Sequence, residues 1–327
     1  MHGTAVIIPF FQREPRSLGA AIRSALGQEG AGLITVVICD DESPVPAETE
    51  LSVLTPKERA QVILVVQKNR GPGPARNAAL DAVPPGTKWI AFLDSDDVWA
   101  PTHLSRSMAA LEEGYDLCFA DALREPETTT HFQNAAFEPG QHEPIGALPG
   151  LFALKGDFVT LNIAMSPVSI STVVIRASTL GDMRFPSMAF EDLVYWFEAA
   201  RRGARVAFDE TLQVRYGRGN ITITENWVSQ RELQNILSYH RVFMSFAKDT
   251  SLTAPQRAIL EQRIASNREL FSVVTLGLMY SAKLPARRIV VDFLALDRLV
   301  IGAFLKAVLT VLRRRLKRSL CRRSLPA

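Results

Sequence analysis

The first 120 residues alternate short runs of β-branched and aromatic residues with stretches of helical spacing, and this alternation restricts the possible folds more than any other feature. The runs that we expect to be strands are Thr4–Pro9, Leu33–Cys39, Val62–Gln67, Trp89–Leu93 and Tyr115–Ala120. The stretches that we expect to be helices are Arg16–Gln28, Arg76–Val83 and Thr102–Glu113. Strands that alternate with helices predict βαβ units, and therefore an α/β fold with a mostly parallel sheet and flanking helices.

The segments that follow the ends of these strands hold the candidate functional residues. The first strand leads into Pro9-Phe10-Phe11, the second into Asp40-Asp41-Glu42-Ser43, the third into a Gly- and Pro-rich segment over residues 69–74, and the fourth into Asp94-Ser95-Asp96-Asp97. Ligands bind to parallel sheets at the carboxyl ends of the strands, where loops and helix N-termini converge. We therefore expect the functional residues at this edge.

The remainder of the chain is predicted to be irregular at first and then helical. Arg124–Gly150 is polar, rich in Pro, Gly and Glu, and without a clear period, which indicates a long loop. The elements that we expect after it are a strand over Ser171–Arg176, a helix over Glu191–Arg202, and strands over Arg205–Phe208 and Leu212–Tyr216. After Asn226 the pattern is helical, with a break near Pro285. We predict a catalytic domain over 1–225, a helical extension over 226–285 and an amphipathic basic tail over 286–327.

Composition argues against several classes of protein. Cys39, Cys118 and Cys321 lie far apart without a C-x-x-C pair, so neither a zinc site nor a disulfide framework is predicted, and a reducing, cytoplasmic setting is the simpler expectation. The last 30 residues hold nine basic residues and no acid, whereas the rest holds 28 basic against 34 acidic residues. A mildly acidic body argues against nucleic-acid binding. No run of about 18 apolar residues indicates a membrane span.

The segment Asp94-Ser95-Asp96 suits a divalent cation. Two carboxylates on one side of a turn can hold Mg²⁺ or Mn²⁺ that also binds a diphosphate. The tripeptide alone is a weak signal. Its position directly after the apolar run Trp89–Leu93 favours a metal site, because acids at the end of a buried strand cost stability unless they bind something.

Three other segments leave alternatives open. Asp40 and Asp41 either cap a turn or accept hydrogen bonds from a nucleobase. Asn69–Asn77 combines glycines with an arginine at an expected helix start, which suits an anion such as a diphosphate, although ordinary turn chemistry explains its glycines and prolines. Glu191 and Asp192 either complement the dipole of an expected helix or supply a general base.

Taken in order, five motifs resemble those of inverting family 2 glycosyltransferases of the GT-A fold. They are VIIPF, VVICDDES, NRGPGPARNAAL, WIAFLDSDDVW and FEDLVYW…ARRGARVAF…VRYGRG, and together they cover about residues 4 to 225. The SPVPAE stretch and the FLDSDDVW…FAD run are similar, more narrowly, to β-glucosyltransferases of succinoglycan-type bacterial exopolysaccharide assembly. The resemblance implies a Rossmann-like GT-A domain followed by a helical C-terminal region.

This resemblance also implies a role for each matching residue. Pro9, Phe10, Asp40 and Asp41 would hold uracil, Arg76 would lie near the uracil and phosphates, Asp94 would contact the ribose, Asp96 would bind Mn²⁺ or Mg²⁺, and Asp192, supported by Glu191, would be the base. The donor would be a UDP-sugar, UDP-glucose above all. The acceptor would be an undecaprenyl-diphosphate-linked oligosaccharide, and the product would be β-linked. Because no Gln-x-x-Arg-Trp follows the base, we expect a non-processive enzyme.

The chain departs from the family pattern at two places. Gln12 and Arg13 precede Glu14 where the family usually has Asn followed shortly by an acid. Arg215-Tyr216-Gly217-Arg218-Gly219 stands where Arg-Tyr-x-x-His is common, so this chain lacks the histidine that would supply a third metal ligand or a phosphate contact.

The C-terminal residues predict an attachment to membranes. Arg287–Leu312 has the pattern of an amphipathic helix, and a basic cluster follows it. Such a tail suits an anionic surface, with roughly 1 kcal/mol for each basic residue near the lipid. We therefore expect a cytoplasmic protein that is peripheral on the inner face of the cell membrane. The alternative is a helix packed on the body with a frayed basic end.

Two other functions compete with glycosyl transfer. A sugar-nucleotide nucleotidyltransferase shares the α/β layout and metal acids, but Phe10-Phe11-Gln12-Arg13 is not the Gly-rich, lysine-bearing loop expected of it. A non-catalytic scaffold with a degenerate site is the second alternative. The joint presence of Asp41, Arg76, Asp94, Asp96 and Asp192 argues against such decay.

Overall fold

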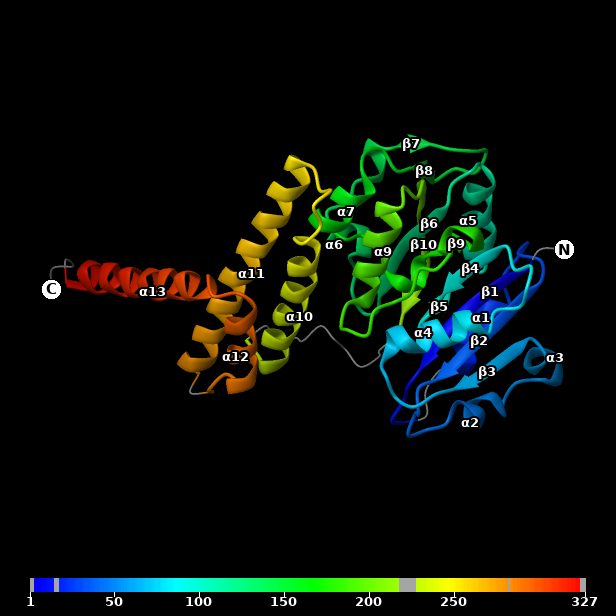
Figure 1. Cartoon of the computed structure of the whole chain (residues 1–327), viewed down its shortest axis with the longest axis horizontal. Coiled ribbons are helices and arrows are strands. Elements are labelled where there is room, and N and C mark those ends of the chain that lie inside the picture. The colour runs from blue at the N-terminus through cyan, green and yellow to red at the C-terminus, as the bar shows by residue number, and fades with distance from the viewer. Residues whose placement is uncertain (1–2, 15–17, 218–227, 282, 324–327) are drawn as a thin grey trace. The chain divides into compact units, whose positions relative to one another are not determined.

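The computed structural model describes residues 3–14, 18–217, 228–281 and 283–323. The chain divides into two compact units, Met1–Asn220 and Ile221–Ala327. The first unit combines a sheet with helices, and the second is built from helices (Figure 1).

A mixed sheet forms the centre of the first unit. In spatial order its strands are β3 (Val62–Val66), β2 (Ile34–Asp40), β1 (Thr4–Phe10), β4 (Trp89–Phe92), β9 (Val174–Arg176), β6 (Leu117–Arg124), β10 (Val206–Tyr216), β8 (Leu151–Ala153) and β7 (Glu143–Pro144), and β5 (Val98–Trp99) pairs with β10. The pairs β3–β2, β2–β1, β1–β4 and β6–β10 are parallel, and β9 lies antiparallel between β4 and β6. The predicted α/β fold with a mostly parallel sheet is confirmed.

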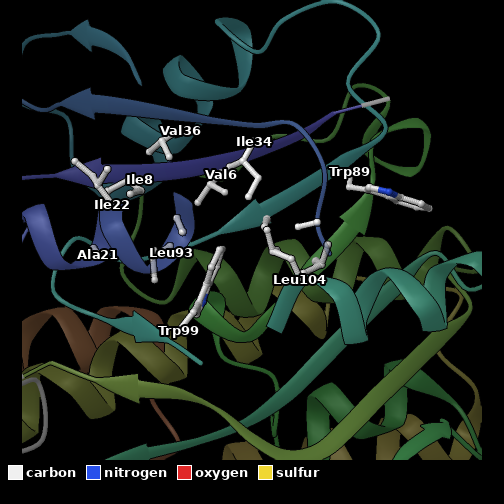
Figure 2. Packing of buried hydrophobic residues seen from close by; sticks show 14 of the residues in the cluster. Val6, Ile8, Ala21, Ile22, Ile34, Val36, Trp89, Leu93, Trp99 and Leu104 are labelled. Atoms are coloured by element: carbon white, nitrogen blue, oxygen red, sulfur yellow. The ribbon is translucent and has the colours of Figure 1, made fainter. Parts of the chain in front are cut away.

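The central strands are apolar throughout because alternate residues enter two separate cores. Val6 and Ile8 of β1 belong to one core, with residues of α1 (Leu18–Leu26) and α5 (His103–Glu112), as Figure 2 shows. Ala5 and Ile7 belong to the other core. The longer helices that contribute to this second core include α4 (Pro72–Asp81), α7 (Phe158–Ala164) and α9 (Glu191–Arg201). Shorter helices are α2 (Ala47–Leu51), α3 (Pro56–Arg59), α6 (His131–Asn134), α8 (Ala177–Leu180), η1 (Pro139–Gln141) and η2 (Ile170–Thr172).

Helix α4 begins four residues before its predicted start at Arg76. Gly71, with φ of 91°, is its N-cap, and Pro72 follows at the first helical position. Proline is favoured at that position because its missing N–H has no partner within the helix and its φ already suits the helix. The glycines and prolines that predicted a loop therefore begin a helix, and Arg76 lies one turn inside it.

Two further predictions about secondary structure are wrong. Arg124–Gly150 contains α6, η1 and β7 rather than one long loop, and α6 begins with a capping box between Thr130 and Gln133. The strands expected at Arg205–Phe208 and Leu212–Tyr216 are a single strand, β10. Its pairing with β6 shifts register between Asp209 and Val214. This irregularity interrupts the alternation of residues along the strand, so the sequence pattern indicated two strands.

In the part of the second unit that the structure describes, residues 228–281 and 283–323, four helices pack around a core of their own. They are α10 (Gln230–Phe246), α11 (Ala254–Tyr280), α12 (Arg287–Leu296) and α13 (Val300–Arg323). Phe271 of α11 and Phe293 of α12 pack with ring centroids 4.1 Å apart and their planes tilted by 33° in this core. The predicted break near Pro285 is confirmed, because Pro285 lies between α11 and α12. No helix among the described residues combines the length and the apolarity that a membrane crossing requires.

The prediction of one continuous helix over Arg287–Leu312 is wrong, because the chain leaves the helix at Asp297. The buried Asp297 carboxylate accepts hydrogen bonds from His240 Nε2 at 2.9 Å, from Arg268 Nε at 2.5 Å and from the Leu299 amide at 3.0 Å. Three donors from outside α12 thus hold this side chain, and α13 begins after it.

Candidate active site

The edge formed by β2, β1 and β4 brings together the first group of predicted site residues. Phe10 pairs in register with Asp40, and the Asp41 amide donates to the Phe10 carbonyl at 2.9 Å. Asp94 follows the end of β4, which is the other neighbour of β1. Pro9 is half-buried, whereas the Phe10 ring is fully buried in the core. The main chain of Phe10, rather than its ring, therefore borders this edge.

Asp40 is a turn and helix cap. Its Oδ1 accepts a hydrogen bond from the Ser43 amide at 2.8 Å, and its Oδ2 accepts one from the Ala47 amide, also at 2.8 Å, where α2 begins. Both carboxylate oxygens thus stabilise the main chain. Of the two interpretations of Asp40, the structure favours the cap.

Asp41 orders the loop that leads into α4. Its Oδ1 accepts from Gln67 Nε2 at 2.7 Å and from the Arg70 amide at 2.9 Å, and its Oδ2 accepts from the Gly71 amide at 2.8 Å. A carboxylate offers about four lone-pair positions, so these three bonds leave room for one further donor. Asp41 can therefore fix the loop and still accept a hydrogen bond from a ligand.

Arg76 links the end of β4 to the start of α9. Its guanidinium is buried, with Nη2 donating to Asp94 Oδ1 at 2.7 Å and Nη1 donating to Glu191 Oε1. Burial alone would lower the pKa of Arg76, but the charges of Asp94 and Glu191 outweigh burial and raise it. The sequence left two interpretations of Glu191 open: it either complements the helix dipole or supports the general base. The structure shows that it is the buried partner of Arg76.

Asp192 follows Glu191 in the first turn of α9. It is half-buried, and its Oδ1 accepts a hydrogen bond from the Leu193 amide at 3.0 Å. Burial and then the charge of Glu191 raise the pKa of Asp192 to about 7, although Arg76 acts in the opposite direction. A carboxyl group with a pKa near the working pH is suited to general base catalysis.

Residues that the sequence did not single out hold the Asp94–Asp97 turn. The Asp97 carboxylate accepts from Ser171 Oγ at 2.6 Å and from the Gly217 amide at 2.8 Å, and Ser171 Oγ also accepts from the Asp94 amide at 3.0 Å. A Cβ on Gly217 would lie 2.0 Å from the Asp96 carbonyl oxygen, so only glycine fits there. The acidic run in the sequence indicated Asp97, but no motif near Ser171 or Gly217 indicated that they bind this turn.

The turn is compatible with a divalent cation. Among the described residues no group of three or more His, Cys, Asp and Glu side chains is arranged to hold a metal on its own. Mg²⁺ and Mn²⁺ commonly bind one or two carboxylates together with substrate phosphates. Burial raises the pKa of Asp97 to about 8, and the charges of Asp94 and Asp96 add to that rise. The negative charges of Asp94, Asp96 and Asp97 repel one another, and a cation near Asp96 would reduce this repulsion. The residues of the turn therefore fit a divalent cation.

The structure describes one of the two departures from the family pattern, at residues 12–14, and only part of the other, at residues 215–219. Gln12 connects the strand ends, because its amide donates to Ser43 Oγ at 2.8 Å and its Nε2 donates to Ser95 Oγ at 3.3 Å. It therefore joins the first strand to the acidic turn. Arg218 and Gly219 lie outside the described residues.

Comparison with known proteins identifies the first unit. The family model described as glycosyl transferase family 2 matches residues 5–161. The succinoglycan biosynthesis protein ExoW of Rhizobium meliloti is 48% identical over 99 residues, which are 30% of this chain and 31% of ExoW. The chain thus matches less than a third of the length of that relative. The Escherichia coli protein named UDP-Glc:alpha-D-GlcNAc-diphosphoundecaprenol beta-1,3-glucosyltransferase WfgD is 26% identical over 59% of this chain and 67% of its own.

Solved glycosyltransferases share the fold. S. aureus TarS 1-349 in complex with UDP-GlcNAc matches with a TM-score of 0.59 and 18% identity, over 92% of this chain and 81% of TarS. The mannosyltransferase PcManGT of Pyrobaculum calidifontis, in complex with GDP-Man and Mn²⁺, matches with a TM-score of 0.58 and 14% identity, over 92% of this chain and 83% of its own. The resemblance expected from the five motifs is confirmed. Residues 5–161 of this chain match the family 2 glycosyltransferase model, and the first unit has the GT-A fold.

Proposed function

We propose that this family 2 glycosyltransferase transfers glucose from UDP-glucose to an undecaprenyl-diphosphate-linked oligosaccharide in bacterial exopolysaccharide synthesis, with inversion and without processivity. One observation carries the proposal: the carboxylate of Asp192 lies in the first turn of α9 beside the buried Arg76–Glu191 pair, and Arg76 also binds Asp94. The names of ExoW and WfgD support the pathway, the donor and the lipid-linked acceptor.

The reaction that fits this geometry is a single displacement. Asp192 accepts the proton of an acceptor hydroxyl while that oxygen attacks the anomeric carbon of the α-linked donor. The new C–O bond forms on the face opposite to UDP, and UDP leaves with the electron pair of the broken bond, so the product is β-linked. A positioned base of this kind contributes roughly 10²- to 10⁴-fold in rate.

The donor would lie along the edge of β2, β1 and β4. Asp41 would accept a hydrogen bond from the uracil beside Pro9 and the main chain of Phe10, and Asp94 would contact the ribose. Asp96 would hold Mn²⁺ or Mg²⁺, an ion that, when bound, neutralises charge on the departing diphosphate. The complex of PcManGT with GDP-Man and Mn²⁺ supports this assignment of the ion.

The second unit would attach the enzyme to the inner face of the cell membrane from the cytoplasm. Ile301, Leu305 and Leu309 follow one another at four-residue spacing on α13 and are 52%, 58% and 54% exposed. Lys306 and Arg313 are exposed on the same helix, and the basic cluster of the sequence follows. An exposed apolar stripe beside basic residues suits an anionic lipid surface, and a lipid-linked acceptor would be held there.

UDP release by the purified full chain tests the proposal. The donors are UDP-glucose, UDP-galactose and their N-acetyl forms, each with Mn²⁺ or EDTA and with or without GlcNAc-diphosphoundecaprenol as the acceptor probe. We expect metal-dependent release from UDP-glucose alone, loss of release in Asp96→Ala, and loss of transfer in Asp192→Asn. Release from another donor would overturn the choice of sugar. The absence of both release and UDP binding would overturn the proposed function.

A further inference from the structure

One face of α4 receives the segment that leads into α9. Gly73, Arg76 and Asn77 are spaced three and four residues apart, so they lie on the same side of the helix. A Cβ on Gly73 would lie 2.5 Å from the Pro186 carbonyl oxygen, which shows how closely the two segments approach. We call Gly73, Arg76 and Asn77 the α4 platform.

Asn77 binds the main chain of this segment from both sides. Its Nδ2 donates to the Phe185 carbonyl at 2.8 Å, and its Oδ1 accepts from the Phe185 amide at 2.9 Å. One side chain thus satisfies both polar groups of a residue that belongs to no helix or strand. Phe185 is thereby fixed 108 residues away from Asn77 in sequence.

Phe185 in turn fixes α9. Its ring stacks on Tyr195 with centroids 3.9 Å apart and an angle of 6° between the planes. Tyr195 follows Asp192 by three residues, so the two lie on neighbouring turns of the same helix face. Phe190, just before α9, has a φ of 59°, a left-handed conformation that a bulky residue keeps only where its surroundings hold it.

We propose that Asn77 and Gly73 are positioning residues for the transfer reaction: with Arg76 they hold the start of α9 so that Asp192 stays in place relative to Asp94. Gly73 allows the close approach, Asn77 fixes Phe185, and Arg76 binds Glu191 and Asp94. The inference rests on the proposed function. It assigns to the segment Asn69–Asn77 a role other than anion binding, namely alignment of the base with the donor.

The experiment compares Asn77→Ala, the milder Asn77→Asp and the control Asn134→Ala in the full chain. Asn77→Asp keeps the acceptor for the Phe185 amide and loses the donor to its carbonyl. Asn134 is exposed at the end of α6. The assay measures kcat and KM for UDP release from the donor that the wild type uses, beside UDP affinity by calorimetry and thermal unfolding.

We expect at least a tenfold fall in kcat for Asn77→Ala and a smaller fall for Asn77→Asp, with KM and UDP affinity within twofold of the wild type. Asn134→Ala should match the wild type. A kcat within twofold of the wild type in a folded Asn77 variant overturns the proposal, and so does a parallel loss of UDP affinity, which would indicate general disorder. If Asn77→Ala does not fold, the kcat, KM and UDP affinity of Asn77→Asp test the proposal in the same way. A wild type that neither binds UDP nor releases it overturns the proposed function itself.

Discussion

Arg76 and Glu191 form a buried ion pair although 115 residues separate them in sequence. The pair joins α4 to the first turn of α9, and the second bond of Arg76, to Asp94, extends it to the end of β4. Elements from the two halves of the first unit therefore meet at one guanidinium.

Removal of the Arg76 charge should destabilise the protein strongly. Arg76→Ala leaves Glu191 buried without its cation, and breaking a buried pair in this way costs about 3–5 kcal/mol. Denaturant unfolding measures this loss. The matched control is Arg184→Ala, which removes the exposed pair with Asp81 and should cost about 0–1 kcal/mol. Equal losses in the two variants would contradict the importance of the buried pair.

The activity of the wild type should rise with pH through about 7. Asp192 must be deprotonated to accept a proton, and burial together with Glu191 raises its pKa to about 7. We expect kcat/KM to increase as pH rises from about 5.5 to about 8. A profile that stays flat over this interval would exclude Asp192 as the group that limits the rate.

Asp192→Asn should abolish transfer and leave the fold intact. Its effect on the free energy of unfolding should depend on pH, because the pKa of Asp192 is raised in the folded state. Such a group favours the folded state below its unfolded pKa of about 3.9, and this contribution is lost as pH rises to about 7. The variant should therefore gain stability relative to the wild type across this interval. Denaturation in EDTA at several pH values tests the trend, and a constant difference would contradict it.

Gly217→Ala should disturb the acidic turn. The added methyl group would meet the Asp96 carbonyl at 2.0 Å, so the turn or the end of β10 must move. We expect weaker metal-dependent donor binding, measured as a higher KM for UDP-glucose and a higher Mn²⁺ requirement. Gly140→Ala is a suitable control for stability, because it also alters a glycine of the first unit but has no atom within 4 Å of the added Cβ and no positive φ. If Gly217→Ala leaves the Mn²⁺ dependence unchanged, the contact between Gly217 and the Asp96 carbonyl does not support the metal site.

Attachment to membranes should depend on the apolar stripe of α13. Replacement of Ile301, Leu305 and Leu309 by Asn removes exposed apolar surface and leaves the helix core in place. We expect loss of cosedimentation with vesicles that contain phosphatidylglycerol. The control replaces Leu33, Val53 and Leu148, which are exposed in the first unit at 57%, 61% and 41%. If both triple variants bind vesicles equally, the stripe is not the attachment surface.

The sequence predicted the central strands well because their burial on both faces leaves an apolar run that few other structures produce. It misplaced the start of α4 because Gly and Pro begin helices as readily as they form turns. It could not predict that Arg76 binds Glu191 or that Ser171 and Gly217 bind Asp97. Those contacts span 115, 74 and 120 residues, and periodicity carries no information over such distances.

The junction at Asp297 has a consequence for how the C-terminal helix can vary. Its carboxylate is held by His240 of α10, Arg268 of α11 and the Leu299 amide, so polar groups of three segments set the direction in which α13 leaves α12. Related chains that keep these three contacts are therefore expected to start α13 in the same direction within the second unit.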